Sequence, residues 1–244
     1  MDSLFRAQML GCDAASGETM ANQLAKIEDT GTANSRSART QMLLMTSAEH
    51  IVAENGPGAL TLRNVAAHAG QGNTNAAIYH FKTVDNLIWN VIEARARTME
   101  LERGRLLAAV KQQGRTDDLA SLLACLINPI ASITDDNGDH IFARFQLQLY
   151  INHHPYSYLL REVINPDFPA RSELLELVSA RIDPSFADFS RYLLPSLVLM
   201  PLNVIFEHDI ARNNGLSPPP LETLCLRSYQ MMAAAIEVGC SGDT

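Results

Sequence analysis

The chain has 244 residues, of which 47% are hydrophobic, and its formal net charge is −8 at pH 7. This length and composition allow a substantial apolar core, in one large domain or in two. Cys12, Cys125, Cys225 and Cys240 are far apart, which indicates neither a zinc site nor a disulfide framework and fits a reducing cytoplasm. The longest apolar stretch, residues 193–206, contains prolines and is shorter than the ~20 residues of a membrane span, so we expect a soluble protein with no membrane partner.

The first 34 residues are polar, rich in Ala, Gly, Ser and Thr, and show no sustained periodicity. We therefore expect residues 1–34 to form a mobile tail. Their pattern does not resemble a signal peptide, which fits a cytoplasmic location.

Residues 59–82 predict a helix, a sharp turn and a second helix. Helical spacing places five apolar residues on one face (Leu60, Leu62, Val65, Ala66 and Ala69). Thr61 occupies the N-cap position, and Leu60 and Val65 have the spacing of a hydrophobic staple. Gly70 and Gly72 are expected to allow a tight reversal that residues with a Cβ would resist.

The second helix is expected to begin near Asn73 or Thr74 and to present short polar side chains at its exposed start. Such a helix can enter the DNA major groove, where Thr74 and Asn75 would meet base edges; a turn-forming role is the alternative. Other candidate DNA-binding residues are Thr61, Arg63, Asn73, Tyr79, His80 and Lys82. The alternatives are capping alone for Thr61, a solvated side chain for Arg63, and packing beside Phe81 for His80. The ring of Tyr79 is expected to pack against Leu62 while its hydroxyl donates to phosphate.

The segment from Arg36 to Arg97 resembles the DNA-binding region of the TetR/AcrR-type bacterial transcription regulators. The resemblance lies in an apolar first helix ending at Gly56, in the run "ALTLR-VA--AG", and in the closing "YHF". The longer turn is similar to a branch of the family that carries Gln-Arg-Asn-Asn-Ser there, with Gly72, Thr74 and Asn75 as departures. The resemblance implies that Tyr79 contacts the DNA backbone. The family's closing Ser-Lys is replaced here by Thr83-Val84, and we expect Lys82 to substitute for the missing lysine.

Charge is distributed in agreement with this interpretation. Residues 35–97 carry six basic and four acidic groups, a net charge of +2, whereas residues 98–244 carry −7. Positive charge therefore concentrates in the segment expected to face phosphate.

Beyond residue 83 the pattern stays helical. A helix beginning at Thr83 or Asp85 is expected to run past Arg103 and to connect the two domains, residues 35–97 and 98–244. Breaks are expected near residue 114 and at residues 134–138, 153–155, 165–169, 183–184 and 213–220. No strand-like alternation persists, so the predicted fold class is all-α.

Residues 98–244 contain no catalytic constellation, and we expect no enzymatic activity, cofactor or metal site. His153 and His154 are adjacent and lack a third ligand at helical spacing, which favours a loop or helix-end role. Pro195 and Pro201 are expected to interrupt the helical run of residues 186–212 by bending or breaking it. The apolar helical surface of this region has two open interpretations, an ordinary helical core and a mostly apolar effector cavity. The candidate lining residues of the cavity are Phe142, Phe145, Met200, Asn203 and Phe206.

Two apolar stripes suit self-association. They comprise Leu193, Leu194, Leu197, Val198, Val204 and Ile205, and then Leu221, Leu224, Tyr229, Met232, Ala235 and Ile236. The resemblance implies that the last two long helices form a four-helix dimer interface, which requires a palindromic operator. The predicted function is a homodimeric repressor that a small, largely apolar effector releases from double-stranded operator DNA. Activation of transcription, in place of repression, is left open. The alternative is an all-α protein-interaction module whose helix-turn-helix no longer binds DNA, and an enzyme using His153 or His154 ranks third.

Overall fold

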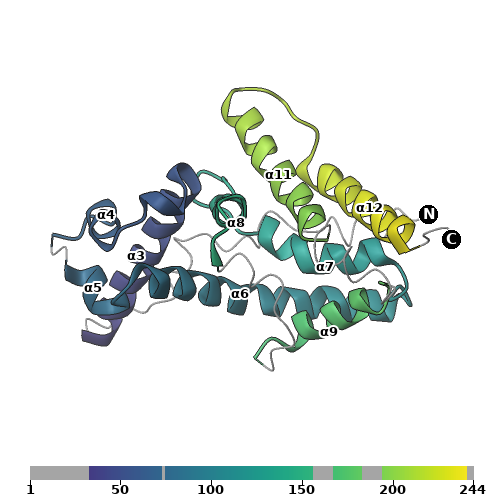
Figure 1. The fold of residues 1–244 in the computed structure, drawn as a ribbon, viewed down its shortest axis with the longest axis horizontal. Helices are drawn as coiled ribbons and strands as arrows, with labels where there is room; N and C mark the ends of the chain where they lie inside the picture. Colours follow the sequence, from purple (N-terminus) through teal and green to yellow (C-terminus); the bar gives the residue numbers. More distant parts are fainter. Residues whose placement is uncertain (1–32, 73–74, 156–166, 183–193, 241–244) are drawn as a thin grey trace. The chain divides into compact units, whose positions relative to one another are not determined.

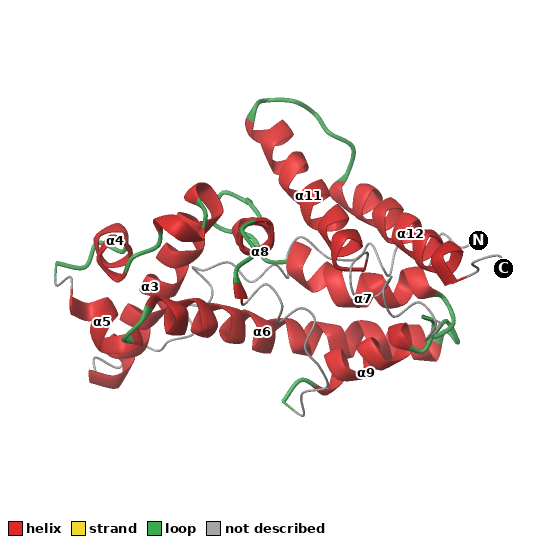
Figure 2. Ribbon diagram, in the orientation of Figure 1, coloured by secondary structure: helices red, strands yellow, loops and turns green. Residues whose placement is uncertain are grey.

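The part of the chain that the structure describes is entirely helical. A computed structural model of the protein describes residues 33–72, 75–155, 167–182 and 194–240, and no strand occurs within these ranges (Figure 2). The elements are α3 (Ala33–Asn55), the 3-10 helix η1 (Pro57–Ala59), α4 (Leu62–His68), α5 (Asn75–Phe81), α6 (Val84–Gln112), α7 (Leu119–Ala131), α8 (Ile141–Ile151), α9 (Pro169–Ser179), α11 (Leu194–Asn213) and α12 (Leu221–Cys240). The predicted all-α class is confirmed for these residues. The predicted tail lies outside them, except that residues 33 and 34 begin α3.

The chain divides into two compact units, each built from separate stretches of sequence. Of the described residues, the first unit contains those from 33 to 96 and from 133 to 155, and the second contains those from 97 to 132, from 167 to 182 and from 194 to 240. The division falls inside α6, a single continuous helix that extends well past Arg103 as expected. The first unit therefore includes α8 together with α3, α4 and α5.

In the first unit, α3 packs against α4, α5, η1 and α8, and α4 packs against α5 (Figure 1). The apolar face of α3 supplies Leu44, Ala48 and Val52, none of which is exposed to solvent. From α8, Phe142 and Phe145 are at most 1% exposed, and their stacked rings lie 5.9 Å apart. Burial of each such side chain contributes about 1.5–3 kcal/mol, so α8 contributes to the core of this unit.

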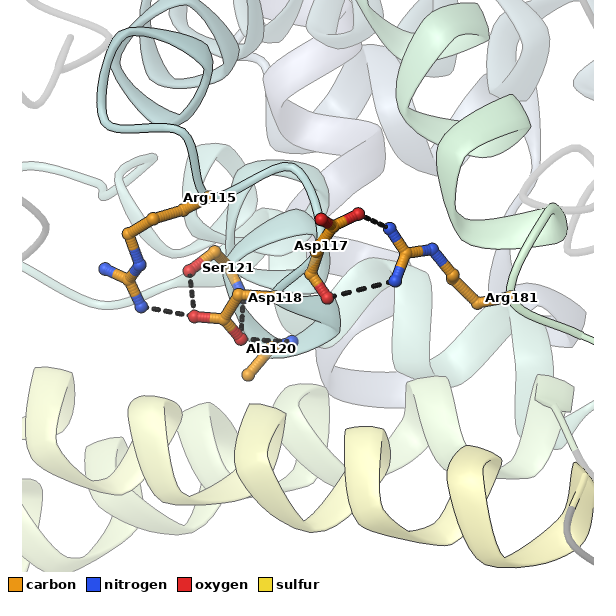
Figure 3. Close-up of polar contacts among 6 residues, drawn as sticks. All are labelled: Arg115, Asp117, Asp118, Ala120, Ser121 and Arg181. Atoms are coloured by element: carbon orange, nitrogen blue, oxygen red, sulfur yellow. Dashed lines mark hydrogen bonds and ion pairs between the residues drawn. The ribbon is translucent and has the colours of Figure 1, made fainter.

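In the second unit, α7 packs against α9 and α12, and α12 packs against α11. Most of α7 is buried, and the Tyr229 hydroxyl on α12 donates to Asn128 Oδ1 on α7 at 2.7 Å. Asp118 caps α7 by accepting from Ala120 N at 3.1 Å and from Ser121 N at 3.4 Å (Figure 3). Its carboxylate also accepts from the Ser121 hydroxyl and pairs with Arg115, which fixes the turn between α6 and α7.

The two prolines do not interrupt α11. Pro195 is its second residue, where an absent N–H removes no intrahelical hydrogen bond. Pro201 lies inside the helix, which continues to Asn213. Of the two expected outcomes, a bend or a break, the break at Pro201 does not occur. A proline removes one backbone hydrogen bond, whereas the neighbouring Leu202 and Ile205 are held in the core at 1% and 0% exposure. Residues 183–193, the start of the predicted run, lie outside the described part.

Several residues expected at a subunit interface are instead buried within one chain. Ile205, Tyr229, Met232 and Ile236 are at most 1% exposed, so the prediction is wrong for these four. Among the described side chains of α11 and α12, the large apolar ones that are exposed are Ile210, Met231 and Val238, with exposures of 36%, 60% and 73%. None of the helices within the described residues has the length and apolarity required to cross a membrane.

Candidate nucleic-acid interface

Helix α4 begins with the cap that the sequence predicts. Thr61 has extended backbone dihedrals, and its Oγ1 accepts a hydrogen bond from Asn64 N at 3.0 Å. Leu60 and Val65 are 5% and 0% exposed, as expected of a hydrophobic staple. Thr61 itself remains at the surface, so one hydroxyl oxygen fixes the helix start at a solvent-exposed position.

The end of α4 explains the need for Gly70 but not for Gly72. Gln71 N donates to Ala66 O at 2.9 Å and Gly70 N donates to Ala67 O at 3.1 Å, the pattern of a Schellman motif. Gly70 has a φ of +65°, a conformation that L side chains rarely adopt. Gly72 has no positive φ, and a Cβ there would meet no atom within 4 Å. The expectation that Gly72 is required for the reversal is therefore wrong.

Helix α5 presents one face to solvent and buries the other. Ala77 and Phe81 are 0% and 2% exposed and lie in the core. On the opposite side, Asn75 is exposed and Ile78 and Tyr79 are 52% and 80% exposed. Lys82 follows the last residue of α5 and is exposed, and its N–H donates to Ile78 O at 3.0 Å. Three chemically different side chains thus share the exposed face of α5, and Lys82 lies just beyond its end.

Two of the predicted α5 contacts are placed differently from expectation. The high exposure of Tyr79 shows that its ring is not packed against Leu62, and its hydroxyl is accessible instead. His80 is half-buried and lies beside Tyr79 and Phe81, with ring centroids 5.2 and 6.1 Å away. The packing of His80 beside Phe81 is thereby confirmed. Asn73 and Thr74 lie outside the described residues.

Lys82 adopts a left-handed backbone conformation between α5 and α6. Its φ is +65°, which is unusual for a residue with a side chain. The next residue, Thr83, caps α6, because its Oγ1 accepts from Asn86 N at 3.1 Å. Helix α6 was expected to begin at Thr83 or Asp85, and it begins at Val84 with Thr83 as its cap. The exposed Lys82 is held at the junction of the two helices.

Four exposed cations of this unit have no acidic partner among the residues that the structure describes. Arg36, Arg39, Arg63 and Lys82 are all exposed, and none forms an ion pair within the described residues. Arg95 differs, because it is paired with the buried Glu49. The positive charge on the outside of α3, α4 and the end of α5 is therefore available to an external anion.

Ile78, Arg36 and Arg39 were not among the residues singled out from the sequence. An isoleucine at helical spacing ordinarily predicts core, and only the observed burial of Ala77 and Phe81 shows that Ile78 faces outward. In the sequence, the two arginines contribute to the positive charge of residues 35–97 without any motif of their own. The signal that could have identified them is their position at the exposed start of α3, before its apolar face begins at residue 44.

The residues expected to line an effector cavity are divided between the two units. Phe142 and Phe145 belong to the core of the first unit, where Arg95 lies over the Phe142 ring at 5.8 Å. The other three belong to the second unit, where Met200 and Phe206 are half-buried and Asn203 is exposed. The core interpretation therefore fits Phe142 and Phe145.

His153 and His154 follow the end of α8, in the helix-end role that was expected. His153 has a φ of +52°, and His154 N donates to Leu149 O at 2.9 Å. Burial lowers the pKa of His154, and the nearby Asp85 opposes this effect. Within the described part of the chain, no group of three or more His, Cys, Asp or Glu side chains is arranged to hold a metal ion.

Comparisons of the chain with protein-family models, with curated proteins and with solved structures found no match. The resemblance to TetR/AcrR-type regulators therefore stays a prediction based on the motif.

Proposed function

We propose that the protein is a transcription regulator that binds double-stranded DNA through the first unit, with α5 in the major groove. The observation that carries the proposal is the exposed face of α5. A helix that leaves a tyrosine and an isoleucine 80% and 52% exposed beside an asparagine and a lysine has a surface suited to a partner. Asparagine can bond adenine edges, isoleucine can contact the thymine methyl group, and tyrosine and lysine can bind phosphate.

The exposed cations support DNA as that partner. Arg36, Arg39, Arg63 and Lys82 lie on the same unit as α5 and lack acidic partners within the described residues. Each can neutralise one phosphate and release one condensed counterion. In this proposal Thr61, at the start of α4, adds a neutral hydroxyl contact to the backbone.

We further propose that two copies bind together to a palindromic site. The exposed Ile210, Met231 and Val238 on α11 and α12 supply apolar surface for pairing, in place of the buried residues first expected there. Two-fold symmetry would place the two α5 helices about 34–36 Å apart, one turn of DNA. Release of the DNA by a small effector, and repression as the sign of regulation, stay predictions.

The test is binding of the purified chain to DNA at two salt concentrations. A DNA sequence is first selected from a random pool, and affinity is then measured by fluorescence anisotropy at low and moderate salt. With about four phosphate contacts per subunit, affinity should fall by about three to five orders of magnitude between 50 and 200 mM salt. Lys82→Ala should reduce this dependence, whereas Lys111→Ala in the second unit should not.

A protein-interaction module is the second candidate, and the exposed apolar side chains of α5 favour it. Ile78 and Tyr79 would anchor a protein partner as readily as they would contact DNA. If no sequence is enriched from the pool and affinity is independent of salt, the DNA proposal is wrong and this candidate replaces it.

A further inference from the structure

Arg103 is a buried arginine in the second unit whose guanidinium is not fully hydrogen-bonded. It lies on α6 and is 4% exposed. Its Nε and Nη2 donate to the Leu126 carbonyl on α7 at 3.4 and 3.3 Å, and Nη2 lies 3.8 Å from Met99 Sδ. Its Nη1 is buried without a hydrogen-bond partner. A buried donor left unsatisfied costs free energy, so this atom requires an explanation.

The positive charge of Arg103 also lacks a bonded acid. Glu100, one turn earlier on α6, is directed elsewhere: its Oε1 accepts from Ala170 N at 2.5 Å and from Arg171 N at 3.3 Å, which caps α9. Within the described residues no carboxylate forms an ion pair with Arg103. Burial and the charge of Arg171 lower the pKa of Arg103 to about 10, against the opposing effect of Glu100. The guanidinium is therefore charged at neutral pH, and no directly bonded carboxylate compensates its positive charge.

A structural role accounts for only part of this geometry. The two bonds to the Leu126 carbonyl connect α6 to α7, and they use the Nε–Nη2 edge of the guanidinium. They leave the two N–H groups of Nη1 without a hydrogen-bond acceptor. Buried charges in proteins are ordinarily paired with an opposite charge, and Arg103 forms no ion pair within the described residues, so a bound anion would supply the missing charge.

We infer that Nη1 of Arg103 binds the carboxylate of a small organic acid between α6 and α7. A carboxylate carries one negative charge and matches the planar guanidinium, so it supplies what Nη1 lacks. Met99, the weak sulfur acceptor beside Nη2, is a flexible residue that can yield its place. The rest of the acid would be apolar, because the neighbouring turns contribute Leu106 and Leu107 from α6 and Leu122 and Leu123 from α7, all at most 5% exposed.

This site belongs to the second unit and does not require that the chain binds DNA. If the proposed function is correct, the acid would be the effector. The effector would then be an anionic molecule, in place of the largely apolar one predicted from the sequence. That consequence rests on the proposed function, whereas the binding site itself does not.

The experiment compares acids with their uncharged amides on the full chain. Benzoate and hexanoate are paired with benzamide and hexanamide, at equal ionic strength, and the melting temperature is followed by differential scanning fluorimetry with calorimetric titration for Kd. The two acids are expected to raise the melting temperature and the two amides are not. Equal effects of acid and amide, or no effect of any of the four probes, would overturn the inference.

Two variants and a matched control locate the effect. Arg103→Met should abolish the response to acids, and Arg103→Lys, which keeps the charge but loses the forked donors, should weaken Kd by about ten- to a hundredfold. Arg105→Met removes an exposed arginine that is paired with Glu102 on the same helix, and it should leave the response unchanged. A response that survives in Arg103→Met contradicts the assignment. If that variant does not fold, the Arg103→Lys value and the acid–amide comparison decide.

A gel-shift assay with benzoate separates this inference from the proposed function. DNA binding without any acid-specific stabilisation would refute the site alone. Acid-specific stabilisation without DNA binding would refute the proposed function alone.

Discussion

Glu49 on α3 and Arg95 on α6 form a bidentate ion pair inside the first unit, with Nε–Oε1 and Nη2–Oε2 distances of 2.6 and 2.7 Å. Their side chains are only 5% and 11% exposed. The guanidinium also lies over the ring of Phe142, so the pair joins α3, α6 and α8. This arrangement pairs one positive charge of the proposed DNA-binding unit internally and holds α3, on which α5 packs, against α6.

Removal of one partner of this pair should strongly destabilise the protein. Glu49→Ala removes the carboxylate partner of the buried Arg95 guanidinium, and we expect the free energy of unfolding to fall by about 3–5 kcal/mol. Urea denaturation followed by circular dichroism measures the change. The double variant Glu49→Leu with Arg95→Met should recover most of the loss, and a double variant as unstable as the single one would show that the charge is not the cause.

Lys82 allows charge and backbone conformation to be separated. Both Lys82→Ala and Lys82→Gly remove the proposed phosphate contact, so both should weaken DNA binding for all sequences and reduce the salt slope by about one unit per contact. Only glycine relieves the positive φ, and Lys82→Gly should be more stable than Lys82→Ala by about 1 kcal/mol. Thermal denaturation and anisotropy titrations measure the two effects. An unchanged salt slope in both variants would remove Lys82 from the interface.

Gly70 and Gly72 should respond in opposite ways to substitution. Gly70→Ala forces a side chain into a left-handed conformation and should destabilise the protein by about 1–2 kcal/mol. Gly72→Arg meets open space, so the fold should tolerate it, and the added cation should tighten DNA binding and steepen its salt dependence by about one unit. Denaturation and anisotropy again provide the readouts. Loss of folding in Gly72→Arg would contradict the geometry of the turn.

Ile78 is expected to read thymine. If its side chain contacts a thymine methyl group, replacement of that dT by deoxyuridine should weaken binding of the original protein but not of Ile78→Ala. The measurement is a double-mutant cycle over each T of the selected site, with Met231→Ala on α12 as the control for removal of an exposed apolar side chain. Additive effects at every T would exclude the contact.

Asp118 should make the second unit sensitive to acid. Burial raises the pKa of Asp118, but hydrogen bonds from Ser121 and Arg115 outweigh this effect and the pKa lies below 3.8. A lowered folded pKa contributes stability that is present above the unfolded value and is lost as pH falls through the folded value. Asp118→Ala should cost about 1 kcal/mol at neutral pH through loss of the cap, and the cost should shrink in denaturation series below about pH 4. If the loss of stability in Asp118→Ala does not change with pH, it arises from lost packing and not from the charge of the carboxylate.

Local features of this chain were predictable because local forces determine them. The cap at Thr61, the reversal at Gly70 and the helix start at Thr83 each depend on hydrogen bonds between residues at most five positions apart. The helical class follows from the same short-range periodicity. These are the features in which sequence and structure agree.

Tertiary relationships could not be predicted in the same way. The pairing of Glu49 with Arg95 joins residues 46 positions apart, and nothing in either neighbourhood indicates the other. The burial of Tyr229 depends on α7, and the outward position of Ile78 depends on which face of α5 contacts α3. The missing hydrogen bond of Arg103 Nη1 depends on how α6 and α7 lie together, which no local pattern specifies.

The first unit is built from two stretches of chain, and the segment between them belongs to the second unit. This has a practical consequence. A fragment that stops after α6 would lack Phe142, Phe145 and Leu149, and the side of α3 that packs against α8 would be exposed to water. Such a truncated protein should aggregate during expression. A minimal fragment for testing the proposed DNA binding must therefore include residues 133–155, joined to α6 by a short engineered linker if the intervening segment is removed.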